Sequence, residues 1–211
     1  MCSLERITVP IDSYTYVLID EAREGDGFGM LQAHQTAFAA GYVREDGAYG
    51  ATKEALQGFV SDKDPDGFAT RNGLQWENAA RHRTLGTRVA RLCRYDDPGG
   101  FTDTVIGIGT TTGTAVPGEL YVGGMYLNPD FHRRGIGKAL LRASLLDFKT
   151  ATIANLDVVR WADAAGFYAH LGFEVQPDIT VDAPSYPKKF GIKLLQQRMT
   201  LCLGPDAPDW L

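Results

Sequence analysis

The sequence predicts a mixed α/β fold: a mostly antiparallel central sheet with one parallel strand pair and flanking helices. β-branched and aromatic residues gather in short runs such as 14–19 and 119–127, which is typical of strands. Apolar residues recur near the helical period over 135–149. Because that helix joins two strands by a crossover, those strands should be parallel, whereas the earlier strands can pair as antiparallel hairpins.

The first half of the chain begins with the strand at 14–19, followed by a helix from Phe28 that Gly41 ends. Residues 42–86 carry many turn signals, so we interpret them as an insertion or flap beside the core. Within them, two short stretches have helical character, 53–60 and 76–83.

The second half alternates more regularly between strands and helices. Further strands are expected at 87–95, 104–108, 119–127, 152–158, 173–175 and 197–203. Helices are expected at 135–149 and 161–171, and Gly172 ends the latter. A proline-rich loop should separate the last two strands, with Pro177, Pro184 and Pro187.

Length and composition favour one domain over residues 1–211 and exclude several classes of protein. The formal net charge is −5 and basic residues gather only locally, so we expect no nucleic-acid partner. No apolar run is long enough for a membrane span or a signal peptide, so we expect no membrane partner and a cytoplasmic location. Three cysteines and four histidines are scattered, which predicts neither a disulfide framework nor a metal site.

Residues 133–138, Arg-Arg-Gly-Ile-Gly-Lys, stand where a loop enters a helix. The N–H groups of a first helical turn have no partner within the helix, and the helix dipole is positive there. Glycines let a ligand approach the backbone, so the segment predicts a phosphate or pyrophosphate site. Ala139 after Lys138 excludes a nucleoside-triphosphate loop, and Leu140 stands where a dinucleotide loop needs its third glycine. The glycines alone leave a solvated surface helix open as the alternative.

Two longer segments resemble motifs of the GNAT acyltransferase superfamily. Residues 125–141 are similar to its coenzyme A motif, in which a strand and a proline-containing loop lead into Arg/Gln-x-x-Gly-x-Gly/Ala at a helix start. Residues 164–173 are similar to its Ala-x-x-(aromatic/Leu)-Tyr-x-x-Leu-Gly-Phe segment, and 197–201 look like its closing strand. The resemblance covers most of residues 14–203 except about 42–86.

The resemblance implies a single GNAT-like acyltransferase domain in which the parallel strands splay apart around the pantetheine arm of acetyl-CoA, the acyl donor, without a metal. Two positions depart from the motifs: His132 replaces the usual Arg or Gln, and Trp161 replaces an Asn that often contacts the pantetheine. The residues assigned to the coenzyme by resemblance are Met125, Tyr126, Leu127, Arg133, Arg134, Gly135, Ile136, Gly137 and Lys138.

Direct attack by an amine makes three chemical demands: the amine must be deprotonated, the carbonyl oxygen needs a donor, and the thiolate needs a proton. The resemblance implies Tyr168 as the acid for the thiolate, with a backbone N–H near Met125 or Tyr126 for the oxyanion. We nominate Glu119, at the start of the motif strand, as the general base, and Tyr121 and His34 compete for that role. The structural alternatives are a core aromatic for Tyr168 and a solvated carboxylate for Glu119.

We therefore expect an N-acetyltransferase that moves an acetyl group from acetyl-CoA to a primary amine by direct attack. The alternatives are a non-catalytic acyl-CoA-binding sensor on the same fold, and acetylation of a protein or peptide. The acceptor should be a small amine or a peptide, and residues 42–86 should shape its choice. A homodimer is one assembly that the sequence leaves open.

Overall fold

The computed structural model describes residues 7–42, 68–82, 86–96, 104–160, 163–182, 195–205 and 207–211. The predicted helical stretch 53–60, Trp161, Pro184 and Pro187 lie outside the described residues. The strands are β1 (Ile7–Pro10), β2 (Thr15–Glu21), β3 (Thr87–Arg94), β4 (Thr104–Gly113), β5 (Glu119–Leu127), β6 (Ile153–Val159), β7 (Glu174–Asp182) and β8 (Leu195–Cys202). The helices are α1 (Gly27–Tyr42), α3 (Phe68–Arg81), α4 (Ile136–Leu145) and α5 (Ala164–His170), with a 3-10 turn, η2, at Pro129–Phe131.

The strands form one sheet in the order β1-β2-β3-β4-β5-β6-β8-β7. The pairs β1–β2, β2–β3, β3–β4, β6–β8 and β7–β8 are antiparallel, and β5 pairs with β6 in parallel. The parallel register begins at Glu119 with Ile153 and ends at Tyr121 with Asn155, although β5 continues to Leu127. The predicted mixed sheet with one parallel strand pair is therefore confirmed.

Contacts within the chain divide it into two compact units. The first unit comprises Met1–Ala37, Ala69–Thr111 and Gly124–Lys149. The second unit comprises Phe38–Phe68, Thr112–Gly123 and Thr150–Leu211. Strands β4 and β5 run from one unit into the other, and the single domain expected from the sequence stays a prediction.

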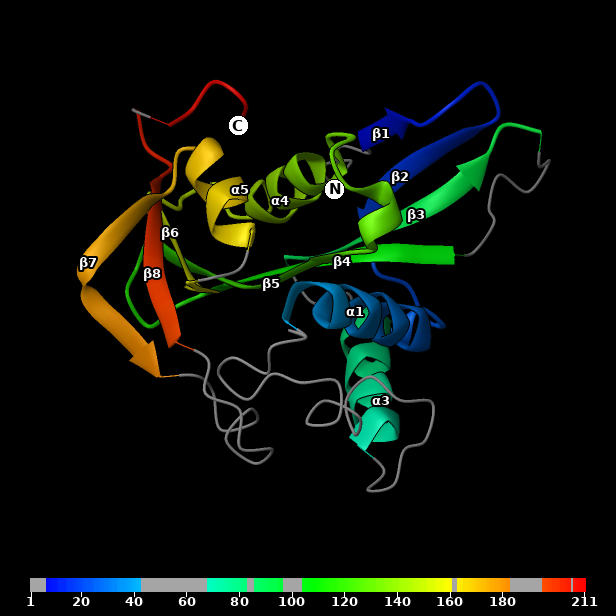
Figure 1. Cartoon of the computed structure of the whole chain (residues 1–211), viewed down its shortest axis with the longest axis horizontal. Helices are drawn as coiled ribbons and strands as arrows, with labels where there is room; N and C mark the ends of the chain where they lie inside the picture. The colour runs from blue at the N-terminus through cyan, green and yellow to red at the C-terminus, as the bar shows by residue number, and fades with distance from the viewer. Residues whose placement is uncertain are drawn as a thin grey trace. The chain divides into compact units, whose positions relative to one another are not determined.

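Helices cover both faces of the strands in the first unit (Figure 1). α4 packs on β1, β2 and β3, where the buried apolar cluster consists of Val17, Ile19, Ala90, Ile106, Ile136, Leu140 and Ala143. α1 and α3 lie on the opposite face, where the cluster consists of Ala22, Met30, Ala33, Ala80, Val89, Val105 and Ile108. Burial of this apolar surface fixes α4, and with it the glycine-rich helix start, on the sheet.

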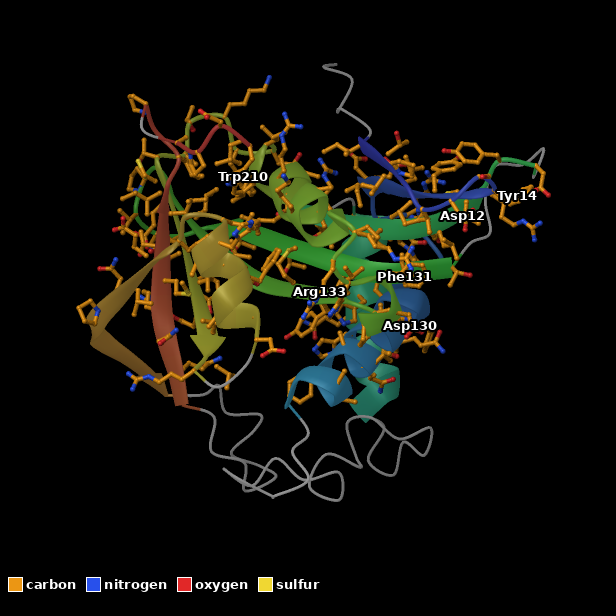
Figure 2. All side chains as sticks on the ribbon, turned by 45° about the horizontal axis from the view of Figure 1, so that its top comes forward. Asp12, Tyr14, Asp130, Phe131, Arg133 and Trp210 are labelled. Atoms are coloured by element: carbon orange, nitrogen blue, oxygen red, sulfur yellow. The ribbon has the colours of Figure 1, made fainter. Side chains whose placement is uncertain are left out.

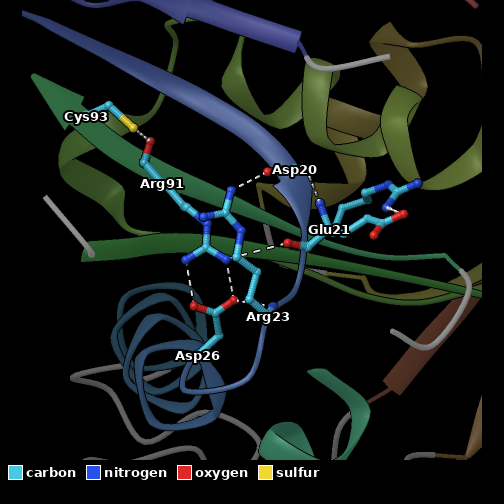
Figure 3. A network of polar contacts seen from close by, with 7 residues as sticks. Asp20, Glu21, Arg23, Asp26, Arg91 and Cys93 are labelled. Carbon is cyan, nitrogen blue, oxygen red and sulfur yellow. Dashed lines mark hydrogen bonds and ion pairs between the residues drawn. The ribbon is translucent and has the colours of Figure 1, made fainter. Parts of the chain in front are cut away.

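A buried ion pair holds the start of α1 against β3. Arg91 is 2% exposed, and its Nη1 donates to Oδ1 of Asp26 at 2.6 Å while Nη2 bonds the other carboxylate oxygen. In Figure 3 the guanidinium faces Asp26 and also reaches the carbonyl of Glu21. Because a buried charge is tolerated only with a partner, this pair fixes where α1 begins.

α3 docks on the same helix start through Glu77. The Glu77 carboxylate accepts hydrogen bonds from the backbone N–H groups of Gly25, at 2.7 Å, and Gly27, at 2.9 Å. A Cβ atom at Gly27 would lie 2.4 Å from the Glu77 backbone nitrogen, so only glycine permits this approach. The helix predicted over 76–83 is thus present, but it begins already at Phe68.

In the second unit α5 packs on β6. Tyr168, Leu171 and Phe173 are buried there, and the Trp210 indole N–H donates to the carbonyl of Leu171 at 3.0 Å. Gly172 follows α5 with φ +93°, a left-handed conformation that suits glycine after a helix. The predicted glycine stop is therefore confirmed.

Some sequence-based expectations are wrong; the first helix, for example, continues through Gly41, its predicted end, to Tyr42. α4 ends at Leu145 rather than at 149, because Asp147 turns inward to accept the Gly86 N–H at 2.9 Å and to pair with Arg88. Pro177, expected in a loop, lies inside β7, an edge strand whose register shifts between Val175 and Thr180. Proline is tolerated at such edges because its missing N–H removes no ladder bond. β1 was not predicted, since a four-residue edge strand carries little pattern.

Candidate active site

The connection from β5 to α4 is held by its own short-range hydrogen bonds. Oδ1 of Asn128 accepts from the Asp130 N–H at 3.1 Å, and Nε2 of His132 lies 3.0 Å from the Leu127 carbonyl oxygen. Phe131 packs against the apolar cluster under α4, and Asp130, Phe131 and Arg133 lie together in this connection (Figure 2). His132 therefore stabilises the loop, a role that the motif comparison did not suggest.

The start of α4 has the geometry of an anion site. Gly135 is the N-cap residue, with φ +81° and without a side-chain capping bond, and the first helical bond runs from the Ala139 N–H to its carbonyl at 3.0 Å. The N–H groups of the first turn therefore lie ahead of the regular ladder, at the positive end of the helix dipole. A Cβ at Gly135 would meet no atom within 4 Å in the described structure, so the approach to this backbone is open.

Charged side chains surround that helix start. Arg133, Arg134 and Lys138 are all exposed, and Arg133 adopts φ +59°, which is uncommon for a residue with a side chain. The pKa of Asp12, in the turn after β1, is lowered mainly because the Tyr14 N–H donates to its carboxylate, and least by the charge of Arg134. Arg134 thus has an acidic neighbour, while the loop as a whole carries positive charge.

The side chains of β5 point to opposite faces of the sheet. Met125 and Leu127 pack against the cluster under α4, whereas Tyr126 packs on the α1 side. Glycines on β4 make room for them: a Cβ at Gly109 would lie 2.9 Å from the Met125 sulfur. The side chains of Met125 and Leu127 are therefore partly buried by packing against the core.

His34, on α1, lies in an aromatic group beside β5. Its ring meets Tyr126 edge-on, with ring centroids 4.1 Å apart, and lies 6.4 Å from the Trp76 ring. Burial lowers the pKa of His34 to about 4. The imidazole is therefore neutral near pH 7, and His34 stays a competing candidate for the general base.

This lowered pKa predicts an acid-sensitive fold. Below pH 6.5 the unfolded chain protonates His34 while the folded chain does not, so stability falls as the pH drops from about 7 towards 4. The loss between pH 7 and pH 5 should be about 2 kcal/mol. Urea unfolding at both pH values should show a smaller loss for His34→Phe, which keeps a ring against Tyr126. An equal loss in both proteins would contradict the burial of His34.

Glu119 lies at the start of β5, in the second unit, and its Oε1 accepts a hydrogen bond from Nδ2 of Asn155 at 2.6 Å. The Tyr121 hydroxyl instead donates to Oδ2 of Asp157 at 3.1 Å. Burial first, and then the Asp157 charge, raises the pKa of Tyr121 to about 12. Tyr121 therefore stays protonated near neutral pH and is unfavourable as a general base.

Tyr168 is 7% exposed and lies on α5 in the second unit. Its ring meets Phe167 and Phe173 edge-on, with centroids 5.1 and 5.4 Å apart. This packing holds the ring in one place, which suits both a core aromatic and a positioned acid. The predicted roles of Tyr168 and Glu119 stay predictions.

The structure thus groups the nominated residues by unit. The nine coenzyme candidates, at 125–127 and 133–138, belong to the first unit, and Glu119 and Tyr168 belong to the second. Sequence reasoning missed four polar residues around Glu119 and Tyr121: Asn155, Asp157, Arg198 and Thr200. Polar residues at alternate positions of β6 and β8 could have indicated them, but only the strand pairing shows that these positions lie on the same face beside Glu119.

The described residues contain neither a metal-binding cluster nor a membrane-spanning helix. Within the described ranges, no group of three or more His, Cys, Asp or Glu side chains is placed to hold a metal ion. No helix in that part of the chain is long and apolar enough to cross a membrane.

Comparison with known proteins gives a family match and many similar folds. Residues 89–175 match the model of the acetyltransferase (GNAT) domain. The PaiA N-acetyltransferase of Thermoplasma acidophilum, in complex with coenzyme A, shares 18% identity at a TM-score of 0.55, over 86% of this chain and 97% of its own. A GCN5-related N-acetyltransferase of Rhodopseudomonas palustris shares 16% at a TM-score of 0.57, over 95% and 99%.

A further similar structure is YncA from Salmonella typhimurium with its cofactor acetyl-CoA, at 19% identity and a TM-score of 0.51, over 91% of this chain and 96% of that chain. None of the curated protein sequences matches the chain. The domain match covers residues 89–175, and the structural matches extend over most of the chain. We therefore identify the chain as one with the GNAT acetyltransferase fold, which confirms the resemblance seen in residues 125–141 and 164–173.

Proposed function

We propose that this protein is an acetyl-CoA-dependent N-acetyltransferase that acts on a primary amine. The observation that carries the proposal is the open start of α4, where Gly135 takes a left-handed conformation and no side chain caps the helix. Such a helix start binds phosphate groups through backbone N–H groups and the helix dipole. The complexes of PaiA with coenzyme A and of YncA with acetyl-CoA support the choice of ligand.

In the proposed complex the pyrophosphate lies on the backbone of residues 133–138. Arg133, Arg134 and Lys138 add positive charge from exposed positions. The pantetheine arm then runs along the backbone of Met125, Tyr126 and Leu127, whose strand has left its parallel partner after Tyr121. This placement leaves the Met125 and Leu127 side chains in the core, where they already pack.

The proposed chemistry is direct transfer to the amine. The ammonium acceptor first gives a proton to the Glu119 carboxylate through a relay of waters, because only the free amine has a lone pair and Glu119 lies about 20 Å along β5 from Met125. The nitrogen then forms the C–N bond at the thioester carbon, and a backbone N–H near Met125 or Tyr126 stabilises the negative oxygen. As the C–S bond breaks, nitrogen loses its second proton to solvent and sulfur takes a proton from Tyr168. Solvent reprotonates Tyr168, Glu119 releases its proton, and the net products are an amide, free coenzyme A and one proton.

We propose a small amine or an amine on a peptide as the acceptor, and the cytoplasm as the place of action. The formal net charge of −5 supports a cationic acceptor, since an acidic protein attracts ammonium groups over a distance. Glu119 supplies a carboxylate within the second unit for such a group.

The test is acetyl-CoA consumption against panels of amines, aminoglycosides, amino acids and peptides. Coenzyme A release, followed as free thiol, should rise above background hydrolysis with at least one amine, and mass spectrometry should find that amine 42 Da heavier, the mass of one acetyl group in place of hydrogen. Calorimetry on the same protein should show acetyl-CoA binding. Binding without turnover across every panel would favour the acyl-CoA sensor instead, and absence of binding would overturn both functions.

A further inference from the structure

In the second unit, one face of strands β5, β6 and β8 carries polar side chains. On β5, β6 and β8 the residues on one face are buried and apolar, such as Leu120, Leu156 and Met199. The alternating residues carry polar side chains, and the strand register places them side by side, with Tyr121 opposite Asn155, Asn155 opposite Thr200, and Asp157 opposite Arg198. The polar residues of this face are Glu119, Tyr121, Asn155, Asp157, Arg198 and Thr200.

One part of this face is a closed ion pair. Arg198 donates to both oxygens of Asp157, from Nε at 2.9 Å and from Nη2 at 3.0 Å. The Tyr121 hydroxyl adds a third donor to the same carboxylate at 3.1 Å. With three donors on one carboxylate, Asp157 is satisfied within the protein and has little capacity left for a substrate.

Glu119 is placed differently. Within the described residues, the side chain that donates to it is Asn155, from Nδ2 to Oε1 at 2.6 Å. Asn155 is itself oriented, because the Thr200 hydroxyl donates to its Oδ1 at 2.6 Å. A rotated amide would turn its oxygen towards the carboxylate, which only accepts, and lose that bond, although the Thr200 hydroxyl could accept from the turned Nδ2. The chain Thr200–Asn155–Glu119 therefore has one direction and holds Oε1 of Glu119, and within the described residues no hydrogen-bond donor reaches Oε2.

We infer that Asn155, oriented by Thr200, is a positioning residue that holds the Glu119 carboxylate for proton abstraction from the acceptor amine. The inference rests on the proposed function, in which Glu119 is the general base. A base must lie within hydrogen-bond reach of the proton that it takes or of the water that relays it, and displacement of a reacting group by about 1 Å can cost about 100-fold in rate. The Asn155 amide, held by Thr200 on the neighbouring strand, supplies that restraint without contacting the substrate.

The test is a double-mutant cycle with Glu119→Gln and Asn155→Leu, using the acceptor found in the screen. Asn155→Leu alone should lower kcat by about 10- to 100-fold with little change in the affinity for acetyl-CoA. In the Glu119→Gln background, where there is no base left to position, the same substitution should cost less than about 3-fold. Thr200→Val should repeat the effect in weaker form, and Thr200→Ser, which keeps the hydroxyl, should restore the rate. The matched control is Thr152→Val, at an exposed threonine whose hydroxyl bonds only the Gly118 carbonyl, at 3.3 Å, in the structure described.

The possible outcomes distinguish a failure of this inference from a failure of the proposed acetyltransferase function. An equal cost of Asn155→Leu with and without the Glu119 carboxylate would assign Asn155 a purely structural role and overturn the inference, while the acetyltransferase stands. Full activity of Glu119→Gln would show that Glu119 is not the general base, and it would overturn the inference as well. If Asn155→Leu does not fold, the Thr200→Val and Thr200→Ser pair decides, because equal rates in those two variants would also overturn it.

Discussion

The Tyr168→Phe variant should lose about 10²- to 10⁴-fold in the rate of acetyl transfer, with almost unchanged affinity for acetyl-CoA. The substitution keeps the ring that packs edge-on against Phe167 and Phe173 and removes only the hydroxyl. A positioned acid acts on the sulfur as the C–S bond breaks and negative charge builds on it, because a thiolate in a poorly solvated site is more basic than in water. The loss should therefore fall on the chemical step and not on binding.

Single-turnover kinetics at saturating acetyl-CoA and acceptor measure that step directly. Calorimetry on the same variant gives the affinity for acetyl-CoA, and thermal unfolding shows whether the core around α5 is intact. Tyr95→Phe is the matched control, since Tyr95 is 60% exposed and loses the same hydroxyl. If Tyr168→Phe keeps most of the single-turnover rate, Tyr168 is a core aromatic and another group protonates the thiolate.

The Gly137→Glu variant should lose at least about 100-fold in affinity for acetyl-CoA. Gly137 is the second residue of α4, in the turn whose N–H groups would hold the pyrophosphate. A glutamate there adds carbon atoms where the ligand must approach and sets a negative charge against phosphate, and like charges brought together cost several kcal/mol. The free protein should tolerate the change, because glutamate is a better helix former than glycine and an acidic residue suits the first helical turn.

Lost affinity together with retained stability would show that Gly137→Glu blocks binding and does not unfold the protein. Calorimetry with acetyl-CoA should detect no binding by Gly137→Glu, while its unfolding midpoint stays equal to or above that of the wild type. Gly41→Glu is the control, because Gly41 is an exposed helical glycine in α1 with nothing within 4 Å of an added Cβ in the described structure. If a folded Gly137→Glu protein binds acetyl-CoA with normal affinity, the coenzyme does not bind at the start of α4.

Several features of this protein can be predicted from the sequence because they depend only on residues that are close together in the chain. The helix start at 135–137 could be predicted because an anion site there needs only backbone N–H groups, glycines and a helix, all of which are consecutive in the chain. The order of strands and helices can also be predicted, because the spacing of apolar residues within each segment indicates whether it forms a strand or a helix. The parallel relation of β5 and β6 then follows from the crossover helix between them.

Features that join distant segments required the tertiary structure. Asn155 and Thr200 are 45 positions apart, and neither is unusual in its own strand, but the register of β6 and β8 sets them opposite each other beside Glu119. The burial that lowers the pKa of His34 to about 4 comes from packing beside Tyr126 and Trp76 on other elements. The sequence by itself predicted where a phosphate can bind, because that candidate site is local. Only the tertiary structure decided how Glu119 is held and that His34 is neutral and Tyr121 protonated near pH 7, because hydrogen-bond partners and burial depend on strands and helices that are far apart in the chain.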